Sequence, residues 1–338
     1  MKKILYSLIA VLAMVMSSCS NDDIEVLHSV NIKVNPSKVI STFTYEYQPG
    51  ELESFPDGYK LRVRLLAYDT KGVLKDSATQ YLTNYGSIAG YNLKLEEGDY
   101  TLVAITDVVG IKGNDVNLEY WHLKNRENLS ETQLSDAGLI GGQHKILGIE
   151  SKNFTIDKTN KECILYPQAV GALCYVVFHN IHQFPDVKQY SLEMTKASDF
   201  LQFNGSGEWL PSVKNNDGSF DWYLAYTEPE ETESYGTYGY YFMLPMPNVN
   251  FKFTYDDTNG DSHDLTQKST VSLEAGVEYG FQIELVVQNN QLQIYSTIGE
   301  VLNGSAKAHT HSLFGPVQKN VTETTCYVKD CINKNAKK

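Results

Sequence analysis

The sequence predicts an all-β protein made of two tandem β-sandwich domains. Apolar and polar residues alternate with a period of two in many short segments, most clearly in residues 30–34, 61–68 and 91–95. Turn-forming residues follow such segments roughly every ten residues, as in the run 69–72. Helical periodicity is rare, so short antiparallel strands are expected rather than a parallel sheet covered by helices.

One segment has a helical pattern. Residues 130–137 are expected to form a short connecting helix, with Ser130 as its N-cap and Leu134 facing inward. This helix would lie inside a long insertion between the strands of the first half.

A turn sequence recurs in the two halves of the chain. Residues 93–100 return approximately as residues 271–279, with one extra residue between the glycine and the tyrosine, and an alternating apolar segment follows each copy. A strand, a glycine that can take positive φ and a return strand indicate a hairpin in both places. The two copies divide the chain into sandwiches at residues 28–160 and 161–298.

The N-terminus has the features of an export signal. Two lysines begin the chain, and the apolar run 4–16 is too short to span a bilayer as a permanent helix, which needs about 20 apolar residues. Small residues then lead to a cysteine. Residues 1–18 are therefore predicted to be a cleaved signal peptide.

The cysteine at the end of this segment has a lipobox-like context. Met16-Ser17-Ser18-Cys19 resembles a lipobox, with Met16 where leucine is usual, so Cys19 is expected to carry acyl chains such as palmitate. The acidic residues that follow resemble the surface-export signal of Bacteroidetes lipoproteins. Several acyl chains make a stable anchor, so we expect residues 19–27 to be a linker on the outer face of the outer membrane.

Charge and motifs exclude several classes of function. Acidic residues outnumber basic ones by 41 to 28, and no basic run interleaved with aromatics is visible, so no nucleic-acid partner is expected. No nucleophile elbow, phosphate loop or Glu-x-x-His motif is present, so neither an enzyme nor a cofactor or metal site is predicted. The acidic run 256–261 is interpreted as a hairpin turn built on Asn259 and Gly260 rather than a calcium loop.

Four cysteines remain besides Cys19, in a compartment where disulfides persist. Cys326 and Cys331 lie in a polar tail, residues 299–338, and could close a small loop. Cys163 and Cys174 flank a strand-like region and can either pair or lie in the core. Three pairings are open, and the sequence does not choose among them.

The motifs together resemble those of the Bacteroidales fimbrillin superfamily. They are the lipobox, the early strand, the Arg-Val-Arg-Leu-Leu-Ala-Tyr-Asp-x-x-Gly hairpin at 62–72 and the Leu-x-x-Gly-x-Tyr-Thr-Leu-Val-Ala segment at 95–104. The resemblance covers residues 1–298. It implies two transthyretin-like, Greek-key β-sandwiches in a lipoprotein precursor that assembles with other fimbrial subunits into a pilus for adhesion.

The resemblance also implies assembly by β-strand complementation, in which a strand from one subunit fills a groove in its neighbour. Stalk and tip subunits of the superfamily open that groove when a protease cuts after an arginine. Here no arginine lies between Cys19 and Arg62, and Arg62 falls within a predicted core strand. Lys33 and Lys38 are the remaining candidates for cleavage. We therefore expect an anchor or accessory subunit, whose first strand stays in its own domain, rather than a stalk subunit.

The alternative is a surface glycan-binding lipoprotein. Such a protein would stack sugar rings on exposed aromatic residues, for which Trp121, Trp209 and Trp222 are the candidates.

Overall fold

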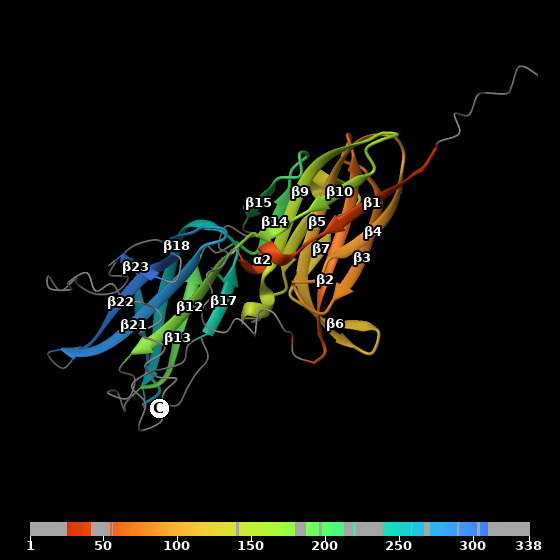
Figure 1. Cartoon of the computed structure of the whole chain (residues 1–338). Helices are drawn as coiled ribbons and strands as arrows, with labels where there is room; N and C mark the ends of the chain where they lie inside the picture. The colour runs from red at the N-terminus through yellow and green to blue at the C-terminus, as the bar shows by residue number, and fades with distance from the viewer. Residues whose placement is uncertain are drawn as a thin grey trace, which may run out of the picture.

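The computed structural model confirms an all-β protein (Figure 1). The described residues are 26–41, 55, 57–139, 142–179, 187–195, 198–212, 219–220, 239–257, 259–266, 271–288, 291–302 and 305–309. The helices among them are short: α2 (Ser37–Ser41), η1 (Leu129–Glu131) and η2 (Gly142–Lys145). Within these ranges no helix has the length and apolar character that crossing a membrane requires.

Two sheets form the first sandwich. Sheet 1 has the order β10 (Glu162–Leu165), β1 (His28–Val34), β4 (Ala89–Leu95). Sheet 2 has the order β11 (Gln168–Ala169), β9 (Leu147–Ile156), β5 (Gly98–Lys112), β2 (Tyr59–Asp69), β3 (Leu74–Leu82), and β6 (Asp115–Glu119) pairs with β5. Apolar side chains from both sheets meet between them in one hydrophobic core.

A third sheet covers the other face of sheet 2. Sheet 3 has the order β15 (Trp209–Ser212), β14 (Phe200–Phe203), β8 (Gln133–Asp136), β7 (Trp121–Lys124). A hydrogen bond of 3.1 Å joins the Tyr68 hydroxyl of β2 to the Thr132 hydroxyl beside β8. Because β2 is covered on both faces, residues 61–68 are all buried. Alternate side chains of this strand therefore face two different interiors, rather than one interior and the solvent.

The second half of the chain contributes two further sheets. Sheet 4 has the order β17 (Gly239–Met243), β12 (Ala172–His179), β21 (Glu278–Gln288), β22 (Gln291–Leu302), β23 (Ser305–His309). Sheet 5 has the order β16 (Ser219–Phe220), β13 (Val187–Thr195), β18 (Met246–Asp257), β19 (Ser262–Thr266), and β20 (Val271–Leu273) pairs with β18. The first eleven residues of the predicted tail thus include the end of β22 and β23.

Strand pairing crosses the expected domain boundary at residue 160. Strand β10 pairs in parallel with β1, and β11 pairs with β9, although both follow that boundary in sequence. Strand β14 reaches still further back, because its Leu201 lies opposite Leu134 of β8. The division at residue 160 stays a prediction, and the first three sheets draw on chain from both sides of it.

The recurring turn is not a hairpin, which corrects the expectation for both copies. Strand β4 belongs to sheet 1 and β5 to sheet 2, so the turn before Gly98 carries the chain from one layer to the other. The second copy does the same, since β20 pairs with β18 while β21 pairs with β12 and β22. A short turn defines where the chain reverses, but the partner of the return strand depends on which neighbour completes each layer.

The predicted hairpin between residues 61–68 and Val73 is confirmed, as β2 pairs with β3. The Asp69 carboxylate accepts hydrogen bonds from the N–H groups of Lys71 and Val73, each 2.9 Å long, and Gly72 takes a φ of 76°. The expected hairpin at Asn259 and Gly260 is likewise confirmed by the pairing of β18 with β19.

The predicted helix over residues 130–137 is wrong. The chain makes only the 3₁₀ turn η1, which Asn128 caps by accepting the N–H of Ser130 at 3.1 Å, and then enters β8. Leu134 faces inward as expected. Pairing of β8 with strands on both sides supplies backbone hydrogen bonds along its length, and this tertiary effect overrides the weak local helical pattern.

Candidate assembly strand and the charge cluster behind it

The strand that strand-based assembly would use is β1, at the centre of sheet 1. It is antiparallel to β4 over its whole length and parallel to β10 from Asn31 to Val34. Val30, Ile32 and Val34 are completely buried, whereas the residues between them are exposed. Burial of each such side chain contributes about 1.5–3 kcal/mol, so three of them together make β1 a substantial part of the first core.

Backbone hydrogen bonds also hold β1 and the residue that follows it. The N–H groups of Asn31 and Asn35 donate to the carbonyls of Lys161 and Leu165, both at 2.8 Å. In α2, the next element, Val39 is completely buried and packs against Gly148. A Cβ added to Gly148 would lie 2.5 Å from a methyl carbon of Val39. Strand β1 and α2 therefore form a continuous, packed segment of the first sandwich.

The two lysines considered for cleavage lie in different settings. Lys33 is inside β1, where its backbone stands opposite Gly90 on one side and Ile164 on the other, and its side chain is exposed. Lys38 lies in α2, with its ammonium group 5.0 Å from the centre of the Tyr166 ring. A protease needs an extended, unpaired stretch of chain, so a cut at Lys33 requires β1 to leave sheet 1 first.

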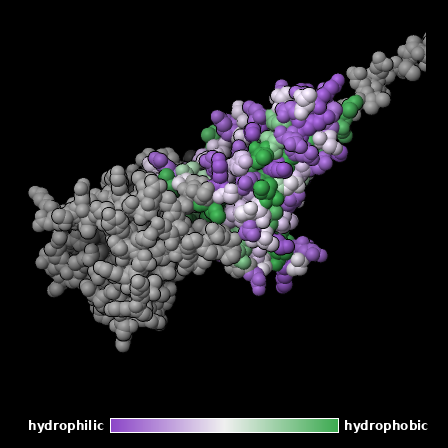
Figure 2. Space-filling model, in the orientation of Figure 1, coloured by the Kyte–Doolittle hydropathy of each residue, from purple (hydrophilic) through white to green (hydrophobic). Residues whose placement is uncertain are grey.

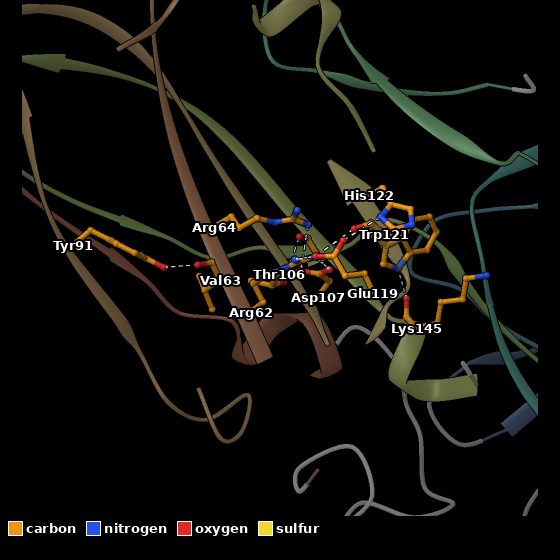
Figure 3. Close-up of polar contacts among 11 residues, drawn as sticks. Arg62, Val63, Arg64, Tyr91, Thr106, Asp107, Glu119, Trp121, His122 and Lys145 are labelled. Atoms are coloured by element: carbon orange, nitrogen blue, oxygen red, sulfur yellow. Dashed lines mark hydrogen bonds and ion pairs between the residues drawn. The ribbon is translucent and has the colours of Figure 1, made fainter. Parts of the chain in front are cut away.

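Arg62 lies in the core strand β2, as expected, and belongs to a buried charge cluster (Figure 3). The arginine cluster consists of Arg62, Arg64, Asp107 and Glu119. Asp107 accepts hydrogen bonds from Nε and Nη2 of Arg62, at 3.0 and 2.6 Å, and from Nη2 of Arg64, at 3.2 Å. Glu119 binds the remaining Nη1 of Arg62.

The cluster joins sheet 2 to sheet 3. Arg62 also donates to the backbone carbonyl of Trp121 at the start of β7, at 3.3 Å. Two positive and two negative side chains balance within the cluster, so the buried charges of Arg62, Arg64 and Asp107 have their partners present, and the Glu119 side chain is partly exposed. It therefore acts as a polar contact between the two layers, closed off from solvent on the side of Asp107, which has no exposed surface.

Burial and pairing shift the pKa values of the cluster in distinguishable ways. Burial disfavours the charge of Arg62, but hydrogen bonds and charge from Asp107 and Glu119 outweigh it and raise the pKa of Arg62. Burial lowers the pKa of Arg64, which has weaker compensation. For Glu119, burial acts to raise the pKa, yet the hydrogen bond and charge of Arg62 bring it below the ordinary value.

A second buried ion pair lies beside Trp121. The Lys145 ammonium is 2.6 Å from the Asp136 carboxylate and 5.6 Å from the centre of the Trp121 ring, whose indole N–H donates to the Lys145 carbonyl at 2.6 Å. Burial raises the pKa of Asp136 and lowers that of Lys145. The Trp121 ring also meets the Phe242 ring of β17 edge to face, with centroids 6.2 Å apart, which links the first sandwich to sheet 4.

The cysteine predictions have different outcomes. Cys19, Cys326 and Cys331 lie outside the described residues, so the lipid anchor and the small loop stay predictions. Cys163 is a buried free thiol, and Cys174 is also buried, which bears out the core position for these two rather than a disulfide between them.

The tryptophan positions bear on the glycan-binding alternative. Trp121 has no exposed surface, so the suggestion that it stacks on a sugar is wrong, and its indole is instead part of the core between the sheets. Trp209 is partly buried against that core, and Trp222 lies outside the described residues.

The sequence reasoning missed Asp107 and Glu119. A signal for them existed, because Arg62 and Arg64 occupy alternate positions of one strand and therefore the same face. Two guanidinium groups on a covered face require carboxylates nearby, and Asp107 lies opposite Arg62 within a mainly apolar stretch of β5.

Comparisons with known proteins find similarity among solved structures. No protein-family model matches the sequence, and the comparison with curated proteins finds no match. The structural neighbours of the chain include Bacteroidales fimbrial proteins and candidate adhesins. The fimbrial anchor protein Mfa2 from Porphyromonas gingivalis is 12% identical, with 84% of this chain and 100% of that chain covered and a TM-score of 0.46.

Two further structural neighbours have other described roles. The tip fimbrial protein Mfa3 from Porphyromonas gingivalis is 9% identical over 80% of this chain and 99% of that chain, with a TM-score of 0.39. A candidate polysaccharide-binding protein from Bacteroides thetaiotaomicron is 12% identical over 86% of this chain and 98% of that chain, with a TM-score of 0.49. A likeness at this level does not assign a function.

Proposed function

We propose that this chain is a non-enzymatic subunit of a surface fimbria, tethered to the outer membrane by a lipid on Cys19, and that it serves as an anchor or accessory subunit rather than a stalk subunit. The observation that supports the proposal is the position of β1 in the sheet. This strand is built into the middle of sheet 1, and no arginine stands between Cys19 and the buried Arg62.

The physical argument concerns how a groove could open. Removing β1 would expose three buried side-chain positions and leave the facing edges of β4 and β10 unpaired, which is the kind of site an added strand completes. An arginine-directed cut at Arg62 would sever β2 inside the core instead. The chain is therefore suited to keep β1, and with it the lipid that precedes it.

The remaining parts of the proposal follow from the same organisation. Residues 1–18 direct export, residues 19–27 link the lipid to β1, and contacts with other fimbrial subunits fall to the C-terminal part of the chain, where Cys326 and Cys331 close a small loop. Strand complementation there would be the mode of assembly.

The test is mass spectrometry of the protein taken from the native membrane, reading its N-terminus. A lipidated Cys19 followed by an intact chain is expected, and Cys19→Ala serves as the matched control that releases the protein from the membrane. An N-terminus after Lys33 or Lys38, without lipid, would contradict the anchor role and indicate a polymerising stalk or tip subunit.

A glycan-binding lipoprotein would behave differently. It would be retarded in a polysaccharide gel, and Trp209→Ala or Trp222→Ala would abolish the retardation. Retention of the lipid together with such retardation would replace the fimbrial proposal.

A further inference from the structure

Sheet 1 has two outer edges, formed by β4 and β10. An unpaired strand edge presents a row of backbone N–H and C=O groups to which a strand of another chain can add. The hydrogen-bond partners of these backbone groups on β4 and β10 decide whether sheet 1 can take up a further strand at either edge.

The β4 edge is occupied by side chains from β3. Gln80 binds both backbone groups of Gly90, because its amide nitrogen donates to the carbonyl and its amide oxygen accepts the N–H at 3.3 Å. Asp76 accepts the N–H of Lys94 at 3.0 Å. Gly90 and Lys94 are four residues apart and their backbone groups point away from β1, so these contacts take places that an added strand would use.

The β10 edge is occupied in the same way from β9. The ammonium of Lys152 donates to the carbonyl of Ile164 at 3.3 Å, and the carboxylate of Glu150 accepts the N–H of Tyr166. Both side chains are charged, and hydrogen bonds to charged groups are stronger than those between neutral groups. A competing strand would have to displace them and offer only neutral backbone groups in exchange.

The outer edge of sheet 3 is protected from strand addition in a different way. Its outer strand β15 contains Pro211, which lies opposite Leu201 and has no N–H to offer an incoming strand. On the face drawn in Figure 2, hydrophobic residues of the described part lie in small groups among hydrophilic ones. On that face (Figure 2), strand edges rather than a broad apolar surface are available for association through the first sandwich.

We propose that Asp76, Gln80, Glu150 and Lys152 are specificity residues that keep a strand of a second copy of this chain from adding to either edge of sheet 1. The only strand position of this sheet left to a partner is then the one that β1 holds. This inference rests on the proposed strand-based assembly for its biological meaning, but its physical content concerns the purified chain alone.

The experiment uses the full mature chain and two double variants, Asp76→Ala/Gln80→Ala for the β4 edge and Glu150→Ala/Lys152→Ala for the β10 edge. Hydrogen exchange of the edge amides and light scattering at rising protein concentration are measured together. Thr79→Ala is the matched control, because Thr79 lies on β3 between the two residues replaced there and its side chain is exposed.

In the wild type and in Thr79→Ala, we expect a monomer in which the amides of Gly90, Lys94 and Tyr166 exchange slowly. In each double variant, we expect exchange at the corresponding edge to rise by about tenfold or more and dimers to form as concentration increases. Two results would overturn the inference. One is fast exchange of these three amides in the wild type, which needs no variant to fold, and the other is a folded double variant that stays monomeric.

Failure of this inference and failure of the proposed function are distinguishable. The exchange and scattering measurements do not depend on the lipid, on cleavage or on any fimbria. A cleaved N-terminus would overturn the anchor role while leaving the edge measurements intact.

Discussion

The carboxylate of Asp107 lies at the centre of the arginine cluster. It has no exposed surface and accepts hydrogen bonds from both Arg62 and Arg64. Asp107→Asn keeps the size of the side chain but removes its charge, so the cluster would hold two guanidinium groups against Glu119 alone. One buried positive charge is then left without a counter-charge.

Removal of one partner from a buried ion pair costs about 3–5 kcal/mol. Two hydrogen-bonding arginines lie against this carboxylate, so we expect a loss in that range of the free energy of unfolding. With a urea m-value of about 3 kcal/mol per molar, appropriate for a larger domain, the unfolding midpoint falls by roughly 1–2 M. That loss is a large part of the total stability of an ordinary domain, about 5–15 kcal/mol.

The assay is urea unfolding followed by tryptophan fluorescence. Trp121 is a suitable probe because it is buried and its carbonyl accepts a hydrogen bond from Arg62. Asp115→Asn, an exposed aspartate on β6, is the matched control and should change stability by less than about 0.5 kcal/mol. Adding Arg64→Met to Asp107→Asn restores charge balance and should recover part of the loss, as a double-mutant cycle would show. A loss below about 1 kcal/mol for Asp107→Asn would refute the reasoning that the cluster is a buried, mutually dependent unit.

Three further predictions concern the strand and the sheets around it. Ile32→Ala in β1 should lower the free energy of unfolding by about 2–5 kcal/mol because it leaves a cavity, while Asn31→Ala, exposed on the same strand, should have little effect in the same urea titration. Gly148→Ala should destabilise by about 1–3 kcal/mol in thermal unfolding, since its Cβ would lie 2.4 Å from the Thr106 hydroxyl of β5 and 2.5 Å from a Val39 methyl carbon of α2. A Cβ on Gly90 meets nothing within 4 Å, so equal effects of Gly148→Ala and Gly90→Ala would contradict the close packing around Gly148. Folding lowers the pKa of Glu119, so the stability that its carboxylate contributes is fully present above its unfolded pKa near 4.5 and is lost as the pH falls through its folded pKa. The difference in free energy of unfolding between wild type and Glu119→Gln should therefore narrow in urea titrations from neutral to acid pH. A constant difference would argue against the pairing with Arg62.

The sequence by itself determined where several strands of the first sandwich lie and which side chains of sheet 1 face inward. Alternation in residues 30–34 and 91–95 was enough, because sheet 1 has one buried and one exposed face, and a period of two then separates core from surface. The hairpin at Asp69 and Gly72 was equally local, since the carboxylate and the positive φ of the glycine act within four residues of chain.

Only the tertiary structure decided which strands pair and what covers them. The turn before Gly98 looks like a hairpin along the chain, yet its two strands complete different layers, and the helical pattern at Leu134 gives way to a strand that gains β14 as a partner from 67 residues further along. For the same reason, the sequence places Arg62 and Arg64 in a core strand but does not show that they form half of a charge cluster. The carboxylates that balance them, and the side chains that occupy the edges of sheet 1, come from other strands, and non-local pairing of this kind is set by how whole layers close over a common core rather than by any local run of residues.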